Sequence, residues 1–222
     1  MAYRPTEKTL ARKAALKKQV LDAALNLVAS GGFNALTITA VAQQAGIATG
    51  AVYKHFESKA HLCAEVFRLA TEKEVAMVRH SAIREGAPAR RLLDTIETFA
   101  LRALRGQRLA YALIAEPVDP SVDLERLRYR HAYAEIFQQL VEDGMACGDF
   151  PQQIAAVSAA ALVGVIAEAL VGPLSWPAES RPAIEQAHLI RSIQAFCLRA
   201  VALKSLEEPT LADAAASPRA KQ

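Results

Sequence analysis

A chain of 222 residues can bury a sizeable core without disulfides or structural metals, either as one large domain or as two small ones. Apolar residues make up 52% of it and charged residues 22%, and the apolar surplus is Ala, Leu and Val rather than aromatic, a mix typical of packed helices. The three cysteines, Cys63, Cys147 and Cys197, are odd in number and far apart, which argues against a disulfide framework and against a CxxC zinc site. We expect each to be a small buried apolar side chain in a reducing compartment.

The net charge of +3 is unevenly distributed. Residues 1–62 carry eight Lys and Arg against three acids, whereas residues 63–222 carry eighteen against twenty. A polyanion-binding region would therefore lie in the first quarter of the chain. The basic N-terminus has no apolar stretch behind it, and the composition of the run IAAVSAAALVGVIAEALVG predicts a segment too short and too alanine-rich to span a membrane, so we expect a soluble cytoplasmic protein.

The helical period runs through nearly the whole chain, and no alternating stretch is long enough to indicate a strand. A first helix is expected over about 8–30, ended by Gly31 or Gly32 in the left-handed conformation. Thr37 is expected to N-cap a short second helix over 37–45.

Gly46 follows this second helix and is expected to make a tight turn. A third helix then runs from 48 or 49 to 55, and Ser58 is the expected N-cap of a fourth helix over 59–81. Two short helices joined by a glycine-containing turn have the size and punctuation of a helix-turn-helix.

The internal spacing of this segment decides which residues face outward. Four apolar positions would pack the short helices together, namely Ala42, Ile47, Val52 and Phe56. The other face of the third helix then carries small, polar and basic residues suited to phosphates and base edges, namely Thr49, Gly50, Tyr53 and Lys54. Lys59 falls in the first turn of its helix, where a cation is unfavourable unless an anion lies nearby.

The segment LTITAVAQQAGIATGAVYKHFESKAHL resembles the DNA-binding domain of the TetR family of bacterial transcriptional regulators. The shared pattern is a Thr-capped helix, an Ala-Gly turn, Gly-x-x-Tyr and Phe-x-x-Lys in this order, within about 17–67. The resemblance implies that the residues at or near DNA are Thr39, Thr49, Gly50, Ala51, Tyr53, Lys54 and His55, and that Lys59 lies at a phosphate. We add Thr37 and Ala48, which open the two short helices, to the predicted DNA-binding residues.

Two positions depart from the family pattern. Ala48 replaces the usual polar residue that opens the recognition helix, and Ala51 stands where Ser or Thr is frequent. Fewer hydrogen-bonding side chains then face the bases, which favours contacts with thymine methyl groups and recognition of DNA shape.

The rest of the chain predicts five further helices. They lie at about 92–104, at 106–116, from 124 through 141 to a stop near DGMACGDF, at 152–171 and at 181–203, and VDPSVD is expected to be a loop. The fold class is therefore all-α, with about nine helices. We expect a three-helix DNA-binding domain with a basic arm at 1–62, a ligand-binding and dimerisation bundle at 63–204 joined to it by a helix, and a disordered tail at 205–222.

The resemblance implies that the last two helices, at about 152–171 and 181–203, form a four-helix homodimer interface. The alternative is that both are buried within one subunit. A two-fold dimer requires a pseudo-palindromic operator.

The resemblance also implies a small-molecule pocket among residues 88–175. Candidates by residue type are Phe99, Tyr111, Glu116, Arg126, Tyr129, Arg130, Tyr133, Phe137 and Trp176. Glu116 is expected to pair with Arg126 or Arg130, as a structural clamp in preference to a ligand contact.

These features together predict a homodimeric TetR-like repressor that binds double-stranded DNA and is released by a small-molecule effector. The alternative from another class is a ligand-independent architectural or nucleoid-associated DNA-binding protein. An enzyme is not expected, because the sequence shows no nucleophile and base constellation, phosphate loop or metal-ligand spacing, and no cofactor or metal is expected either.

Overall fold

The computed structural model describes residues 6–175 and 185–202, and every regular element within these ranges is a helix. The elements are α1 (Glu7–Gly31), the 3-10 helix η1 (Phe33–Ala35), α2 (Ile38–Gln44), α3 (Thr49–Val52), α4 (Lys59–Ala82), α5 (Pro88–Arg105), α6 (Gln107–Ile114), α7 (Pro120–Cys147), α8 (Ala155–Ser175) and α9 (Gln186–Ala202). The predicted all-α fold is thus confirmed. Trp176, the start of the predicted last helix and the predicted tail lie outside the described residues.

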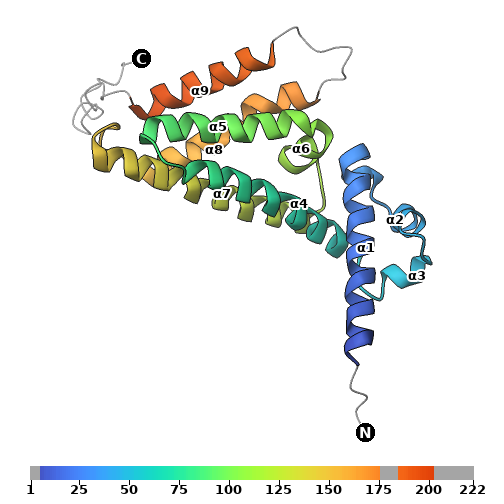
Figure 1. Ribbon diagram of the computed structural model, residues 1–222. Helices are drawn as coiled ribbons and strands as arrows, with labels where there is room; N and C mark the ends of the chain where they lie inside the picture. The colour runs from blue at the N-terminus through green and yellow to red at the C-terminus, as the bar shows by residue number, and fades with distance from the viewer. Residues whose placement is uncertain (1–5, 176–184, 203–222) are drawn as a thin grey trace, which may run out of the picture.

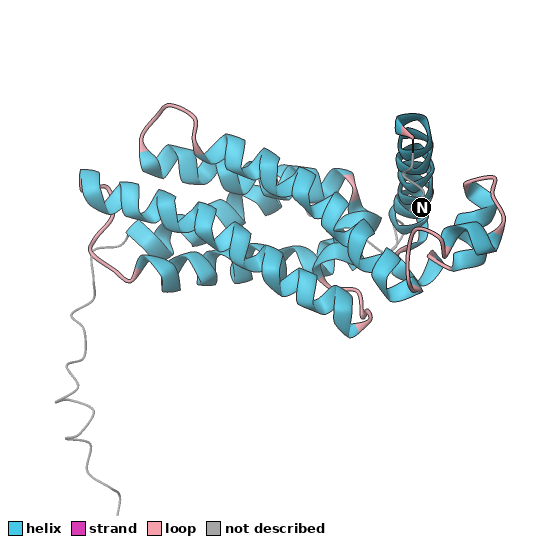
Figure 2. Ribbon diagram, turned by 90° about the horizontal axis from the view of Figure 1, so that it is seen from below, coloured by secondary structure: helices cyan, strands magenta, loops and turns pink. Residues whose placement is uncertain are grey.

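The helices form two groups that meet along α1, α4 and α6 (Figure 1). In one group, α2 and α3 lie beside α1, which runs across the end of the other group. The second group is an elongated bundle of α5 to α9, and α4 extends along it from the first group. Figure 2 shows α1 nearly end-on, with the short helices on its far side from the bundle.

Local signals place several helix ends where the sequence predicts them. The hydroxyl of Thr37 accepts a hydrogen bond from the Ala40 amide at 3.1 Å, and that of Ser58 accepts one from the His61 amide at 3.0 Å. Each satisfies a backbone donor that the first turn of a helix leaves free. Gly46 has φ +64°, as the predicted turn requires.

Three expectations about helix ends are wrong. Gly32 follows α1 with φ 74° and ψ −174°, which is outside the left-handed helical region. Helix α3 is a single turn, because its Thr-Gly-Ala-Val sequence holds no strong helix former beyond one Ala, and the chain continues in tighter turns through Phe56. Helix α7 begins inside the expected loop, because Asp119 caps it and Pro120 suits the first helical position.

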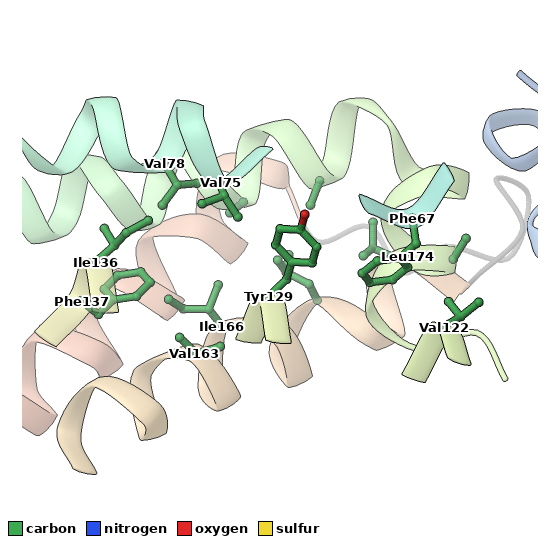
Figure 3. Close-up of a cluster of buried hydrophobic side chains, with 14 of the residues drawn as sticks. Phe67, Val75, Val78, Val122, Tyr129, Ile136, Phe137, Val163, Ile166 and Leu174 are labelled. Carbon is green, nitrogen blue, oxygen red and sulfur yellow. The ribbon is translucent and has the colours of Figure 1, made fainter. Parts of the chain in front are cut away.

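The core runs through the bundle as one layer of apolar side chains (Figure 3). Phe67 and Val78 of α4 face Tyr129 and Phe137 of α7, and Ile166 of α8 closes the cluster from below. Burial of this kind is the main favourable term in folding, and each large side chain contributes about 1.5–3 kcal/mol.

Helix α8 is more apolar than expected. It has 21 residues with mean hydropathy 2.0 in its most apolar stretch, so it is long and apolar enough to cross a membrane, contrary to the prediction. The core helix of a soluble protein passes the same test, and α8 packs on α7 and contributes Leu162, Ile166 and Leu170 to the core.

Two of the three cysteines are buried as expected, and burial raises the pKa of both Cys63 and Cys197 to about 11. Neither is a reactive thiolate at neutral pH. Cys147 is exposed, contrary to the expectation, because it is the last residue of α7 and lies at a chain reversal before Gly148.

Candidate functional site

The short helix α2 packs against α1, and α3 packs against α2. Ala42, Val52 and Phe56 are buried between them, and Ile47 is half-buried at the corner. The side chain amide of Gln19 in α1 donates to the Ala45 carbonyl at 2.7 Å, which ties the end of α2 to the long helix.

The face of α3 and of the turn after it points away from this core. Ala48, Thr49, Gly50 and Lys54 are exposed, and Tyr53 retains 54% of its accessible surface although it is aromatic. Ala51 and His55 are half-buried at the margin. Thr37, which caps α2, and Thr39, in its first turn, are exposed. The predicted DNA-facing residues of the short helices are therefore exposed or half-buried and none of them belongs to the core.

Gly50 has no structural need to be glycine. Its φ is not positive, and a Cβ atom built there meets nothing within 4 Å. Glycine in a helix costs about 1 kcal/mol relative to Ala. The packing of this chain therefore does not account for it.

Basic side chains of α1 reach the same surface. Burial lowers the pKa of His55 first, and the charges of Lys13, Lys17 and Lys54 lower it further. Two of these lysines belong to α1 and one follows α3. Lysines from α1 and from the turn after α3 therefore lie near the same imidazole, and Lys17 also lies 3.9 Å from the Glu65 carboxylate.

Lys59 is exposed at the first position of α4, whose first turn holds no acid. Neighbouring residues satisfy two backbone amides at this helix start. The Ser58 hydroxyl accepts from the His61 amide, and the Nδ1 atom of His61 accepts from the Glu57 amide at 3.4 Å. The free end of the Lys59 side chain is thus available beside a helix terminus that itself favours anions.

The bundle holds a cavity of about 120 Å³ between α4, α5, α6, α7 and α8. Most of its wall is apolar. The residues that line it are Phe67, Thr71, Glu74, Val78, Phe99, Arg102, Ala103, Gly106, Leu109, Ala110, Leu113, Ile114, Arg126, Tyr129, Arg130, Tyr133, Val163 and Ala167.

The polar groups of the wall are mostly paired with one another or with neighbours. Arg102 binds Glu74 through two hydrogen bonds, one of them 2.9 Å long, between α5 and α4. The hydroxyl of Tyr129 donates to Glu72 at 3.2 Å, and burial, followed by the Glu72 charge, raises its pKa to about 12. Burial also raises the pKa of Tyr133. Both tyrosines are therefore neutral donors at neutral pH.

Five of the nine predicted ligand residues line this cavity, namely Phe99, Arg126, Tyr129, Arg130 and Tyr133. Tyr111 instead lies against Arg108, and Phe137 is fully buried in the core. The α4 wall was missed, because Phe67, Thr71, Glu74 and Val78 have the same spacing as an ordinary core face.

The expected pairing of Glu116 with Arg126 or Arg130 is wrong. Glu116 is 2% exposed, and its carboxylate accepts from the Phe33 amide at 3.0 Å and lies 3.5 Å from Arg108. Arg126 binds the backbone carbonyl of Glu116 at 2.8 Å and not its side chain. The carboxylate is thus a buried clamp between the bundle and the start of η1.

A helix-turn-helix that presents a polar face beside basic side chains defines a DNA-binding protein. Residues 20–66 match the family model described as bacterial regulatory proteins, tetR family. This match assigns the N-terminal DNA-binding domain to the TetR family, and the curated relatives that match the chain are transcriptional regulators and not enzymes.

Two curated relatives agree with this assignment. The HTH-type transcriptional repressor KstR2 of Rhodococcus jostii is 27% identical over 146 residues, 64% of this chain and 71% of the relative. The repressor KstR of Mycolicibacterium smegmatis is 36% identical over 76 residues, 34% of this chain and 37% of the relative.

Two solved structures share the fold. The fatty acid degradation regulator FadR of Bacillus halodurans has a TM-score of 0.69 at 17% identity, over 88% of this chain and 97% of its own. FadR of Bacillus subtilis in complex with stearoyl-CoA has a TM-score of 0.70 at 16% identity, over 82% of this chain and 98% of its own.

Proposed function

We propose that this regulator is a repressor that binds a pseudo-palindromic operator as a homodimer and leaves it when a small molecule fills the cavity. The domain that binds DNA is 1–62, and the ligand-binding and dimerisation domain is 63–204. The exposed polar face of α3 beside the basic side chains of α1 is the observation that carries the proposal. The curated relatives are named repressors, which supports repression over activation.

The DNA contacts of the proposal follow from residue chemistry. Tyr53 and Lys54 bind phosphates, and Thr49 reads a base edge. Gly50 lets the backbone approach the duplex, which explains a glycine that the packing does not require. Ala48 and Ala51 offer methyl groups to thymine.

The dimer of the proposal forms through α8 and α9. The outer side of α8 is exposed and made of small or apolar residues, among them Ala156, Val157, Ala160, Ala161 and Gly164. Phe196 of α9 is 53% exposed. Small side chains allow close helix approach, and an exposed apolar patch of this kind marks an interaction surface.

The effector of the proposal is a molecule with an apolar body, because the cavity wall is predominantly apolar. One structural neighbour is a fatty acid degradation regulator, and another is a transcriptional regulator that was solved with stearoyl-CoA. Fatty acyl compounds are therefore the first class to test.

Selection of genomic fragments by the purified full-length protein, followed by footprinting, tests the proposal. A repressor protects one short palindrome in each bound fragment and releases it on addition of stearoyl-CoA or another acyl compound. Uniform protection that no ligand changes contradicts the proposal and indicates an architectural DNA-binding protein.

A further inference from the structure

The cavity and the DNA-binding domain are joined through the side chain of Arg126. This arginine lines the cavity from α7, and its side chain is 15% exposed. It donates to the carbonyls of Leu113 at 3.0 Å and Ala112 at 3.2 Å, which end α6, and to the Glu116 carbonyl just beyond. A guanidinium at this place neutralises the negative end of the α6 dipole and holds the segment that carries Glu116.

Glu116 continues the connection into the other domain. One oxygen of its carboxylate accepts the Phe33 amide, and Arg108, which approaches the other oxygen, donates to the Gly31 carbonyl at 2.6 Å. The end of α1 and the start of η1 are thereby fixed to the end of α6. Hydrogen bonds to a buried carboxylate are strong, and leaving such a group unpaired is costly.

The aromatic rings of this region form a second contact along the same line. Phe33 and Phe67 are stacked with centroids 6.3 Å apart, and Phe67 lies 6.1 Å from Tyr129. Phe67 and Tyr129 line the cavity, and Figure 3 shows them side by side in the core. The guanidinium of Arg126 lies over Phe67 at 6.0 Å, so the ring and the cation would respond together to an occupant of the cavity.

The charge of the cavity wall indicates which kind of occupant Arg126 meets. The lining holds three arginines and a single carboxylate, and that carboxylate, Glu74, is paired with Arg102. Arg126 pairs with Asp123 of its own helix, whose side chain is 56% exposed, and Arg130 has no ion pair within the described residues. Burial lowers the pKa of Arg126, and its other partners are three neutral carbonyls, with which an anion in the cavity would compete.

We propose that Arg126 transmits the binding of an effector in the cavity to the DNA-binding domain. An anionic group on an apolar effector draws the Arg126 guanidinium away from the carbonyls at the end of α6. The hydrogen bond between the Glu116 carboxylate and the Phe33 amide then weakens. The inference rests on the proposed function and adds to it both a charge for the effector, a carboxylate or a phosphate, and a route for the signal. The differential contact that release requires is the exchange of partners at Arg126.

Amide hydrogen exchange at Phe33 tests the route without DNA. In Arg126→Gln the Phe33 amide should exchange about tenfold faster than in the wild type. Arg130→Gln is the matched control, because Arg130 lines the same cavity but makes no hydrogen bond or ion pair within the described part of the chain. Equal exchange at Phe33 in Arg126→Gln and the wild type overturns the proposal.

A second measurement uses the wild-type protein and therefore does not depend on the variant folding. Decanoate, decyl phosphate and 1-decanol share an apolar chain and differ in the head group. Both anions, or one of them, should bind more tightly than the alcohol and accelerate Phe33 exchange, and the comparison of the two anions identifies the head group.

Anion binding that leaves Phe33 exchange unchanged overturns the proposal, as does equal binding of anions and alcohol. Neither result involves an operator. Uniform protection of genomic DNA would contradict the proposed function alone, so the two failures are distinguishable.

Discussion

Gly32 lies where the chain has room for no side chain. Its φ of 74° with extended ψ belongs almost only to glycine, and a Cβ atom there would be within 2.6 Å of both carboxylate oxygens of Glu116. Gly32→Ala should therefore lower the free energy of unfolding by roughly 2–5 kcal/mol, from backbone strain together with displacement of the carboxylate. Urea denaturation measures it.

Gly46→Ala is the matched control for this change. Gly46 also has positive φ, but its added Cβ meets nothing within 4 Å, so only the backbone cost of about 1–2 kcal/mol applies. Equal losses in the two variants would show that the carboxylate moves aside without cost.

His55 should make DNA binding depend on pH. Its pKa in the free protein is lowered by burial and by three lysines, so protonation destabilises the free fold as pH falls below about 6.5. DNA phosphates near His55 would stabilise its imidazolium and so raise its pKa. If His55 lies at the DNA as proposed, affinity should rise as pH falls through this range, by at most about tenfold per pH unit for each proton taken up.

Titration of the operator complex between pH 5.5 and 7.5 at constant ionic strength measures this dependence. His55→Asn should flatten it, since Asn keeps a similar polar size without the charge. An identical pH dependence in the variant would place His55 away from the phosphates.

At the scale of single helices, ends set by neighbouring residues could be predicted from the sequence. Thr37, Ser58 and Gly46 act through their own turn, and each does what was expected. The end of α3 and the start of α7 could not be predicted in this way. The end of α3 depends on weak helix propensities, and the start of α7 depends on Pro120, a residue type that suits a loop and a first helical turn equally.

The cap of α2 gives a prediction at this scale. Thr37→Ala removes the acceptor for the Ala40 amide and should cost about 1 kcal/mol in thermal or urea unfolding. Thr37→Ser keeps the hydroxyl and should restore most of that stability. If Ser is as destabilised as Ala, the methyl group of Thr37 and not its hydroxyl stabilises the helix.

The start of α4 gives a second prediction. Lys59→Ala should weaken binding to all DNA sequences and reduce the slope of log affinity against log salt by about 0.9 for each phosphate that the variant no longer neutralises. Lys73→Ala is the control, as Lys73 is exposed on the same helix roughly 20 Å further along. An unchanged slope in Lys59→Ala would show that this lysine does not bind a phosphate.

At the scale of the whole molecule, contacts between distant segments limited prediction. The fold class could be predicted because every segment repeats the helical period. The partner of Glu116 could not, because the Phe33 amide lies 83 residues away and has no distinguishing side chain chemistry. The cavity wall on α4 could not either, since a wall residue and a core residue have the same pattern.

Assembly gives the last prediction, because the proposed dimer face is defined by exposure on α8 and α9. Val157 is 63% exposed, and Val157→Glu would place an unpaired charge in the proposed interface, so the dimer dissociation constant should rise at least about a hundredfold. Leu124 is 70% exposed on α7, and Leu124→Glu should leave the dimer intact. Sedimentation velocity measures both variants, and monomers that still protect a full palindrome would contradict the dimeric operator complex.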